Sequence, residues 1–555
     1  MPLPSAVSAA PPEEAVGPLE RGLTVLRVLG AAGSDGSAES LRASDLARET
    51  GLARSTVDRI VSTLLRLGYL RGDGRELTTA PRLMELGDAY LRSSGLPDLL
   101  GPAALRLADE LEESVSLAVP DGTGVRFVSQ TARRRTMSVA FRVGDLLPAE
   151  RCAPGALFAA HWQPEQYEAW LTRRQDDPEE RGFPALPPRS RSSAPDLDAF
   201  AAATAFAREH GWALDDQLIE PGLIALAAPV RDASGRVVCA VSVVSHSSRH
   251  SAASLRQLAL DPLLATAAAM ERELVHAGGT GSEFADHSFD TADAKGELGP
   301  EFLQSLARGL AVLTALGSRR GGLALTEVAQ VTGLSRATAR RSLITLTHLG
   351  YAAAEGRIFR LLPRVLELGY APLSTLTLPE LADPHLARLV QQVHESASMA
   401  VLDGDDVRYV ARVATVRIMH VDITVGTRFP AYATSMGRVL LAALPPAERK
   451  GYLRELRLRP LTRFTVGSPA ALGRLLDAAA RDGYALVDQE LEEGLRSLAV
   501  PVRDRHGRAV AAVNVSTHAG LRSAEQTREE LLPALAEAAA GIEADLARVT
   551  ARNGG

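Results

Sequence analysis

The sequence predicts an α+β protein made of two tandem units. One stretch occurs twice, from Leu41 to Leu70 and from Leu323 to Tyr351, at a shift of 282 residues. Each copy is followed by alternating apolar runs paired around Asp-Gly or other glycine turns, a pattern typical of β-hairpins. Helical segments flank these runs, as in the α+β class. A repeat this long indicates duplicated domains, because solenoid repeats are far shorter.

The repeated stretch has the spacing of a helix-turn-helix. In the second copy we expect Thr326 to cap the first helix, Gly333 to supply a left-handed turn and Ser335 to cap a second helix that ends at Gly350. Leucines at helical spacing face a core, and arginines gather in the N-terminal half of the second helix. A helix that enters a major groove reads bases with that half, and arginine matches guanine O6 and N7. An ordinary helical hairpin with solvated arginines is the alternative.

A short hairpin, or wing, follows each helix-turn-helix, with Gly74 and Gly356 at the tips. Its arginines, including Arg71 and Arg75, are suited to phosphate contacts, which position a module without reading sequence. The residues that we expect at DNA are Arg54, Ser55, Thr56, Arg59, Arg336, Ala337, Thr338, Arg340, Arg341, Arg357 and Arg360.

The distribution of charge agrees with this interpretation, although the net charge of the chain is −6. From Gly17 to Arg82 there are 10 arginines and 8 acidic residues, and from Glu301 to Arg364 there are 9 arginines and 3 acidic residues. These counts give +2 and +6, so the basic charge is concentrated in the two predicted DNA-binding segments.

A first helix precedes each copy, because RGLTVLRVLG at Arg21 matches RGLAVLTALG at Arg308 in seven of ten positions. After each wing we expect a connecting helix, from Pro81 and from Pro363, and then a larger domain of hairpins and helices. The expected divisions are a disordered N-terminus (1–17), a first winged helix-turn-helix (18–82), a first large domain (83–275), a linker (276–300), a second winged helix-turn-helix (301–364), a second large domain (365–548) and a tail (549–555).

Several protein classes are excluded. No run of about 18 apolar residues could span a bilayer and no signal peptide is present, so we expect a cytoplasmic protein. Cys152 and Cys239 are too few for a disulfide framework and are expected to be buried as small apolar side chains. The chain has no GxSxG, Walker A or HExxH motif, its histidines lack ligand spacing, and we expect no enzyme activity, cofactor or metal.

The residues quoted above, with VGTRFPAYATSMGRVLLA from Val425 and DQELEEGLRSLAVPVRD from Asp488, resemble the IclR family of transcriptional regulators. The resemblance is strongest to regulators of protocatechuate and 4-hydroxybenzoate breakdown through the β-ketoadipate pathway. It covers residues 301 to 548 closely and residues 18 to 275 less closely. It implies a winged helix-turn-helix followed by a GAF-like effector-binding domain that responds to small carboxylates. The tandem fusion departs from the usual single unit.

The resemblance also implies where a ligand lies in the second large domain: near Ser435, Met436, Asp488, Ser497, Asn514 and Ser516. An anionic ligand needs cationic partners as well, and a guanidinium binds a carboxylate bidentately. The candidate arginines are Arg412, Arg428, Arg438 and Arg496.

The first large domain lacks most of these groups. The four arginines are replaced by Gln130, Leu146, Ala156 and Ile224. Ser497 and Ser516 are replaced by Ala225 and Val244, and only Asp216 and Ser242 keep a polar character. The first domain is therefore not expected to bind an acid.

We predict a sequence-specific DNA-binding transcriptional regulator that responds to a small aromatic or dicarboxylic acid of the β-ketoadipate pathway. Its expected partners are double-stranded operator DNA and a small carboxylate, with self-association left open and no membrane. Two alternatives stay open: an enzyme acting on a small carboxylate, and an architectural DNA-binding protein that senses nothing.

Overall fold

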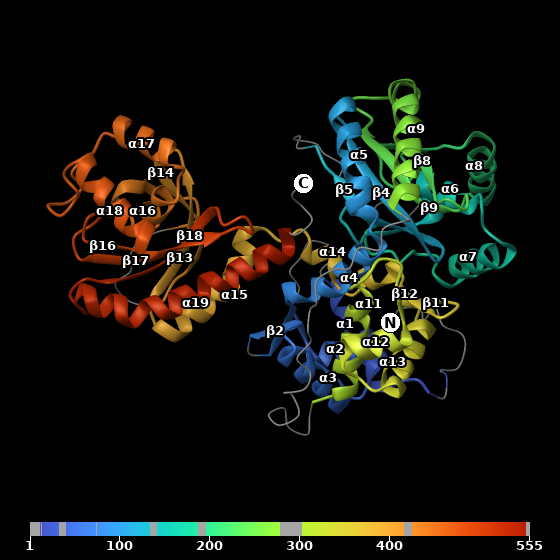
Figure 1. Ribbon diagram of the computed structural model, residues 1–555, viewed down its shortest axis with the longest axis horizontal. Coiled ribbons are helices and arrows are strands. Elements are labelled where there is room, and N and C mark those ends of the chain that lie inside the picture. The colour runs from blue at the N-terminus through green and yellow to red at the C-terminus, as the bar shows by residue number, and fades with distance from the viewer. Residues whose placement is uncertain are drawn as a thin grey trace. The chain divides into compact units, whose positions relative to one another are not determined.

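The computed structural model describes residues 12, 14–32, 40–73, 75–133, 141–186, 196–277, 302–415 and 424–550. The chain forms two compact units, Met1–Thr375 and Leu376–Gly555 (Figure 1). The first unit holds both winged helix-turn-helix modules and the first large domain, and the second unit is the second large domain. Most of the N-terminus, linker and tail expected from the sequence lie outside the described residues, as does Gly74.

Each winged helix-turn-helix consists of three helices and a three-stranded sheet. The first comprises α1 (Gly17–Ala32), β1 (Leu41–Arg42), α2 (Ala43–Thr50), α3 (Arg54–Arg66), β2 (Leu70–Asp73) and β3 (Glu76–Thr79). The second comprises α11 (Gln304–Leu316), β10 (Leu323–Ala324), α12 (Leu325–Thr332), α13 (Arg336–His348), β11 (Ala352–Glu355) and β12 (Ile358–Leu361). The wings predicted from the sequence are confirmed.

The turn chemistry is confirmed in part. Ser335 caps α13, since its Oγ accepts a hydrogen bond from Thr338 N at 3.2 Å, and Gly333 is left-handed with a φ of 64°. Thr326 does not cap α12, so that prediction is wrong. The helix begins earlier, and the carboxylate of Glu327 accepts a hydrogen bond from Ala324 N at 2.7 Å, which satisfies the end of the helix.

The connecting segments differ between the copies. In the first, η1 (Pro81–Leu83) runs directly into α4 (Met84–Ser94), as expected. In the second, η4 (Pro363–Glu367) and α14 (Tyr370–Leu373) are separated at Gly369, so the predicted continuous helix is wrong there. Gly369 has a φ of 105°, and an added Cβ would lie 2.7 Å from a methyl of Leu83. The left-handed backbone favours glycine at this position, and the Leu83 side chain would have to move to admit a Cβ.

The two winged helix-turn-helix modules pack against each other through equivalent residues. Leu306 lies on Gly22 of α1, and Leu19 lies on the equivalent Gly309 of α11. The backbone N–H of Val16 donates to Thr345 Oγ1 at 2.9 Å, and that of Leu303 donates to Thr63 Oγ1 at 3.0 Å. Reciprocal contacts of this kind define an approximate two-fold axis within one chain.

Asp88 and Tyr370 meet across this axis. They occupy equivalent positions, 282 residues apart, and the Tyr370 hydroxyl donates to Asp88 Oδ1 at 3.1 Å. Both side chains are buried. A contact between equivalent positions lies on the axis itself, and here it joins two unlike residues.

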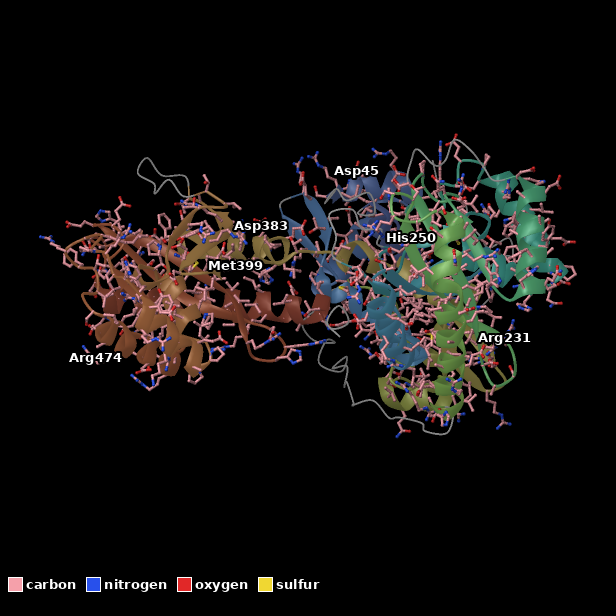
Figure 2. All side chains as sticks on the ribbon, turned by 90° about the horizontal axis from the view of Figure 1, so that it is seen from above. Asp45, Arg231, His250, Asp383, Met399 and Arg474 are labelled. Atoms are coloured by element: carbon pink, nitrogen blue, oxygen red, sulfur yellow. The ribbon has the colours of Figure 1, made fainter. Side chains whose placement is uncertain are left out.

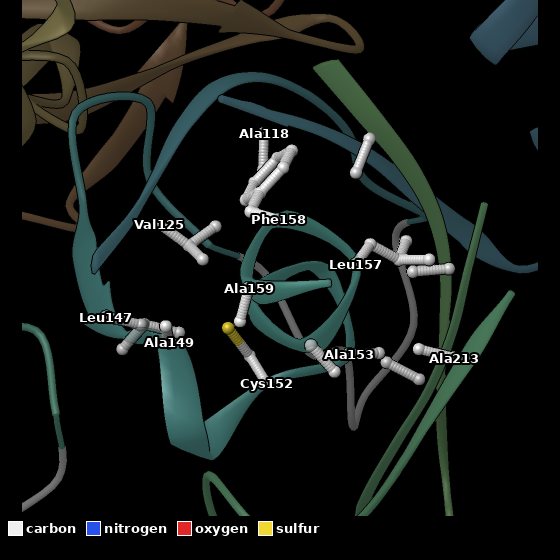
Figure 3. Packing of buried hydrophobic residues seen from close by; sticks show 14 of the residues in the cluster. Ala118, Val125, Leu147, Ala149, Cys152, Ala153, Leu157, Phe158, Ala159 and Ala213 are labelled. Carbon is white, nitrogen blue, oxygen red and sulfur yellow. The ribbon is translucent and has the colours of Figure 1, made fainter. Parts of the chain in front are cut away.

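The first large domain is a six-stranded antiparallel sheet of order β6-β5-β4-β9-β8-β7. Helices α6 to α8 cover one face, and α5 and α9 cover the other (Figure 1). Cys152 is buried among Ala149, Ala153 and Ala159 (Figure 3), and Cys239 is buried as well, as predicted. The elements are α5 (Leu96–Leu111), β4 (Ser114–Asp121), β5 (Gly124–Thr131), β6 (Leu146–Pro148), η2 (Ala149–Arg151), α6 (Ala153–Ala159), α7 (Pro164–Asp176), α8 (Leu197–His210), β7 (Ala213–Asp216), β8 (Leu223–Arg231), β9 (Val237–His246) and α9 (Ala252–Ala277).

The second large domain repeats this architecture, with sheet order β15-β14-β13-β18-β17-β16. Helices α16 and α18 pack on one face, and α15 and α19 pack on the other. The elements are α15 (Leu378–Val393), β13 (Ser396–Asp403), β14 (Asp406–Val413), β15 (Arg428–Pro430), η5 (Ala431–Ala433), α16 (Ser435–Ala442), α17 (Pro446–Glu455), α18 (Pro469–Asp482), β16 (Ala485–Asp488), β17 (Leu495–Arg503), β18 (Ala509–His518) and α19 (Ala524–Thr550).

Candidate functional site

A row of polar side chains crosses the sheet of the second large domain on the face covered by α16, which we call the α16 face. Ser398 of β13 lies between Arg412 of β14 and Asn514 of β18 in the strand register. Ser398 and Asn514 are buried, and Arg412 is half-buried. Successive residues of a strand point to opposite faces, so residues paired across the ladder share a face. Ser398 belongs to this row and was not among the residues predicted from the sequence.

Further polar groups from the predicted set join this row. Ser435, at the start of α16, is hydrogen-bonded to Ser497 of β17, with 2.8 Å between the two Oγ atoms. Asn514 Nδ2 donates to Ser516 Oγ at 3.1 Å, and its buried Oδ1 has no hydrogen-bond partner within the described residues. Buried polar atoms are normally satisfied by protein, water or ligand. The α16 face therefore offers a cation, hydroxyls and a side-chain amide within one core.

A β-bulge gives Arg412 its direction. The register between β13 and β14 shifts between Met399 and Ala400, which leaves Val410 as an extra residue in β14. Tyr409 lies in the cluster under α16, whereas Ala411 lies in the cluster under α15 and α19. The extra residue turns Arg412 back to the α16 face, as a bulge does.

Apolar groups complete the site. Met436 of α16 is fully buried in the same cluster as Tyr409. Burial raises the pKa of the Tyr409 hydroxyl to about 12, and the Arg412 guanidinium opposes part of that shift. Tyr409, like Ser398, was missed by sequence reasoning, because neither residue stands in a motif of its own.

Arg438 is buried but already neutralised. Its Nη2 donates to Glu490 Oε2 at 2.6 Å, and its Nε donates to the Tyr432 carbonyl at 3.0 Å. The Glu490 carboxylate also accepts from Val466 N at 2.9 Å. This network fixes the loop before β17 against α16.

Arg496 and Asp488 lie on the opposite face of the sheet. They form a bidentate pair, with Nε to Oδ1 at 3.0 Å and Nη2 to Oδ2 at 2.9 Å. Arg496 Nη1 also donates to Thr527 Oγ1 of α19 at 3.4 Å, and the adjacent Leu498 packs under α15 and α19. The structure does not bring this pair together with Ser435 and Ser497.

Arg428 lies on the exposed edge strand β15. Its Nη1 donates to Asp403 Oδ2 at 2.7 Å, and its Nε donates to Asp406 Oδ2 at 3.2 Å. Of the four predicted arginines, Arg412 alone combines a half-buried position with the polar row on the α16 face.

The first large domain carries an uncharged version of the row. Gln130, Ser116 and Ser242 are neighbours in the register of β5, β4 and β9, and the same kind of bulge precedes Gln130. Ala225 and Val244, in place of two serines, belong to the apolar core there.

The second helices of the two DNA-binding modules present their predicted residues to solvent, but with unequal charge. On α3, Arg54, Ser55 and Arg59 are exposed and Thr56 is half-buried. Arg54 Nε pairs with Asp58 Oδ1 at 2.8 Å. On α13 the exposed residues are Arg336, Ala337, Arg340 and Arg341, with Thr338 half-buried behind the capping Ser335.

The N-terminal segment contacts α13. The Glu14 carboxylate pairs with Arg340, and Arg341 Nε donates to the Glu14 carbonyl at 3.4 Å. On the second wing Arg357 is exposed, and Arg360 is half-buried and paired with Glu355.

Two further classes of site were sought in the described ranges. No helix there is both long and apolar enough to cross a membrane. No group of three or more His, Cys, Asp or Glu side chains there could hold a metal ion.

Comparison with known proteins gives concordant matches for both units. The IclR helix-turn-helix domain matches residues 18–74 and 305–356, and the domain described as bacterial transcriptional regulator IclR C-terminal matches residues 88–272 and 370–544.

Three relatives each correspond to a little under half of this chain. The Pca regulon regulatory protein of Pseudomonas putida is 46% identical over 237 residues, which cover 42% of this chain and 81% of that protein. The p-hydroxybenzoate hydroxylase transcriptional activator of Acinetobacter baylyi is 35% identical over 240 residues, covering 42% and 89%. A solved transcriptional regulator from Rhodococcus sp. RHA1 is 53% identical, covers 45% of this chain and 99% of its own, and has a TM-score of 0.44. The chain belongs to the IclR family of DNA-binding transcriptional regulators, which is not an enzyme family, and carries both domains of that family twice.

Proposed function

We propose that this regulator binds operator DNA through α3 and α13 together and that its second large domain senses a small aromatic or dicarboxylic acid of the β-ketoadipate pathway. The observation that carries the proposal is the polar row on the α16 face, with Arg412 at one end. Relatives named for the Pca regulon and for p-hydroxybenzoate hydroxylase support the same class of ligand.

In this proposal Arg412 binds the carboxylate of the effector. A guanidinium matches a carboxylate in two parallel hydrogen bonds, and its half-buried position strengthens the attraction. Ser398, Asn514 and the Ser435–Ser497 pair would bind a ring hydroxyl or a second polar group, and Met436 would pack against the carbon skeleton. Arg438, bound to Glu490 beside the row, and the Arg496–Asp488 pair, on the opposite face of the sheet, would hold the surrounding structure.

The first large domain acts as a built-in partner rather than as an acid sensor. Gln130 stands where Arg412 stands in the second domain, so the row has no cation to balance a carboxylate. The proposed divisions of the chain remain residues 18–82, 83–275, 301–364 and 365–548.

Binding to the full chain tests the effector site. Titration calorimetry with 4-hydroxybenzoate, protocatechuate and β-ketoadipate should give saturable binding, and a bound ligand should raise the thermal midpoint, because it stabilises only the folded state. Arg412→Met should weaken binding about 10- to 100-fold, the equivalent of about 1.5–3 kcal/mol for hydrogen bonds to a charged group.

Arg428→Met is the matched control, because it removes the same charge from an exposed edge strand. It should bind as the native chain does. Equal losses in the two variants would place the carboxylate elsewhere. If the affinity for DNA stays the same when each of these acids is bound, the architectural alternative is favoured.

A further inference from the structure

A pocket of about 410 Å³ lies where the two winged helix-turn-helix modules meet. Its polar lining comes from Arg21 of α1, Thr56 and Arg59 of α3, and Gln304, Ser305 and Arg308 of α11. Arg21 and Arg308 are equivalent residues of the two copies, 287 positions apart (308 − 21). The pocket therefore exists only because α1 and α11 pack side by side.

Within the described residues, no acidic side chain lines this pocket. Within the described part of the chain, the guanidinium groups of Arg21, Arg59 and Arg308 take part in no hydrogen bond or ion pair, unlike Arg54 and Arg340. Three like charges around one pocket repel one another unless an anion lies between them. The N-terminal end of α11, where the helix dipole is positive, borders the same pocket.

We propose that this pocket binds a phosphodiester group of the DNA backbone at the junction of the two modules. Thr56 and Arg59 stand on α3, the helix proposed to read the major groove, so the pocket adjoins the proposed DNA surface. Phosphate oxygens are the usual partners of arginine side chains and helix N-termini at such surfaces. This assignment rests on the proposed DNA-binding function and adds Arg21 and Arg308 to it.

On the other half of the pair, part of the chain itself lies on the equivalent surface. Arg341 is the counterpart of Arg59, and the Glu14 segment lies against it, with the Glu14 carboxylate on the adjacent Arg340.

The salt dependence of DNA binding by the full chain tests the proposal. A labelled duplex of about 30 base pairs and unrelated sequence is titrated at several salt concentrations. Loss of one phosphate contact lowers the slope of log affinity against log salt by about 1. Arg308→Gln and Arg21→Gln should each show this change, with affinity about tenfold lower at low salt, and with the same factor on any sequence.

Arg474→Gln is the control, because it removes the same charge from an exposed position on α18 (Figure 2). It should keep the native slope. A circular dichroism spectrum and a thermal midpoint like those of the native chain check that each variant is folded, and Arg308→Lys should recover part of the slope.

The outcomes separate this proposal from the proposed function. If the native chain binds no DNA, both the proposed function and the phosphate site are wrong. Native binding with unchanged slopes in Arg308→Gln and Arg21→Gln overturns the phosphate site alone. Stabilisation by pyrophosphate that disappears in Arg308→Gln, without any change in the DNA slope, overturns the assignment to the DNA backbone.

Discussion

The difference between the two large domains comes down to a few positions. Arg412 in one domain and Gln130 in the other follow the same bulge and stand beside the equivalent residues Ser398 and Ser116. Residue types at these positions were readable from the sequence. The face of the sheet on which each side chain lies could not be predicted, because one extra residue in a strand moves all following side chains to the opposite face. Simple alternation would have placed Arg412 on the other face of the sheet.

Asp215 in the first large domain gives a residue-scale prediction. It is fully buried, and burial raises the pKa of its carboxyl from 3.8 to about 8. The folded state therefore keeps a proton that the unfolded state releases above about pH 4. Stability is fully present below that pH and is lost as the pH rises through about 8.

Asp215→Asn should remove this dependence, because the amide is uncharged and its oxygen can still accept the hydrogen bond from Leu218 N, 2.8 Å long in the native chain. The variant should gain thermal stability relative to the native chain at pH 8.5 and gain little at pH 5. Glu209→Gln, which removes an exposed carboxylate on α8, is the control and should show the same thermal stability as the native chain at both pH values. A native pH profile in Asp215→Asn would contradict the assignment.

At the scale of elements, the two recognition helices have the same fold but differ in the charges that they expose. The repeat and its turn residues were enough to predict both helices, since Gly333 and Ser335 act locally. The connecting segments after the wings were harder, because Gly369 adopts its left-handed conformation where the two modules touch, at Leu83. Long-range packing of this kind leaves no local pattern in a sequence.

The unequal surfaces predict an asymmetric operator. In α3 the Arg54 guanidinium is shared with Asp58, whereas α13 has Arg336 and, at the position of Asp58, Arg340. Arg336→Ala should cost about 1–3 kcal/mol of operator affinity if it reads a base, and Arg54→Ala should cost less. Fluorescence anisotropy on the footprinted operator measures both. A palindromic footprint, with equal losses of affinity in the two variants, would contradict the prediction.

At the scale of the whole molecule, one chain should cover two half-sites. Recognition helices of paired helix-turn-helix modules bind about one turn of DNA apart, roughly 34 Å. The fused chain forms its module pair internally, and the Tyr370–Asp88 hydrogen bond stands on the axis of that pair.

Tyr370→Asp would place two carboxylates against each other in this buried contact, and should lower both the thermal midpoint and the DNA affinity of the full chain. Asp88→Asn alone should change little, because the amide still accepts from the tyrosine. Combined with Tyr370→Asp, it should restore part of the loss. A double-mutant cycle of thermal midpoints measures this coupling, and strictly additive effects would show that the two residues do not interact.

The axis contact also bears on how such a chain can evolve. In a dimer of identical subunits, a mutation on the two-fold axis is inherited by both partners at once and must tolerate its own copy, so an aspartate there would face an aspartate. Once the two halves are encoded in one chain, either side can mutate while the other stays as it is. An aspartate opposite a tyrosine is an outcome open to the fused gene and closed to its single-unit ancestor, and the same freedom extends to the two DNA-reading helices.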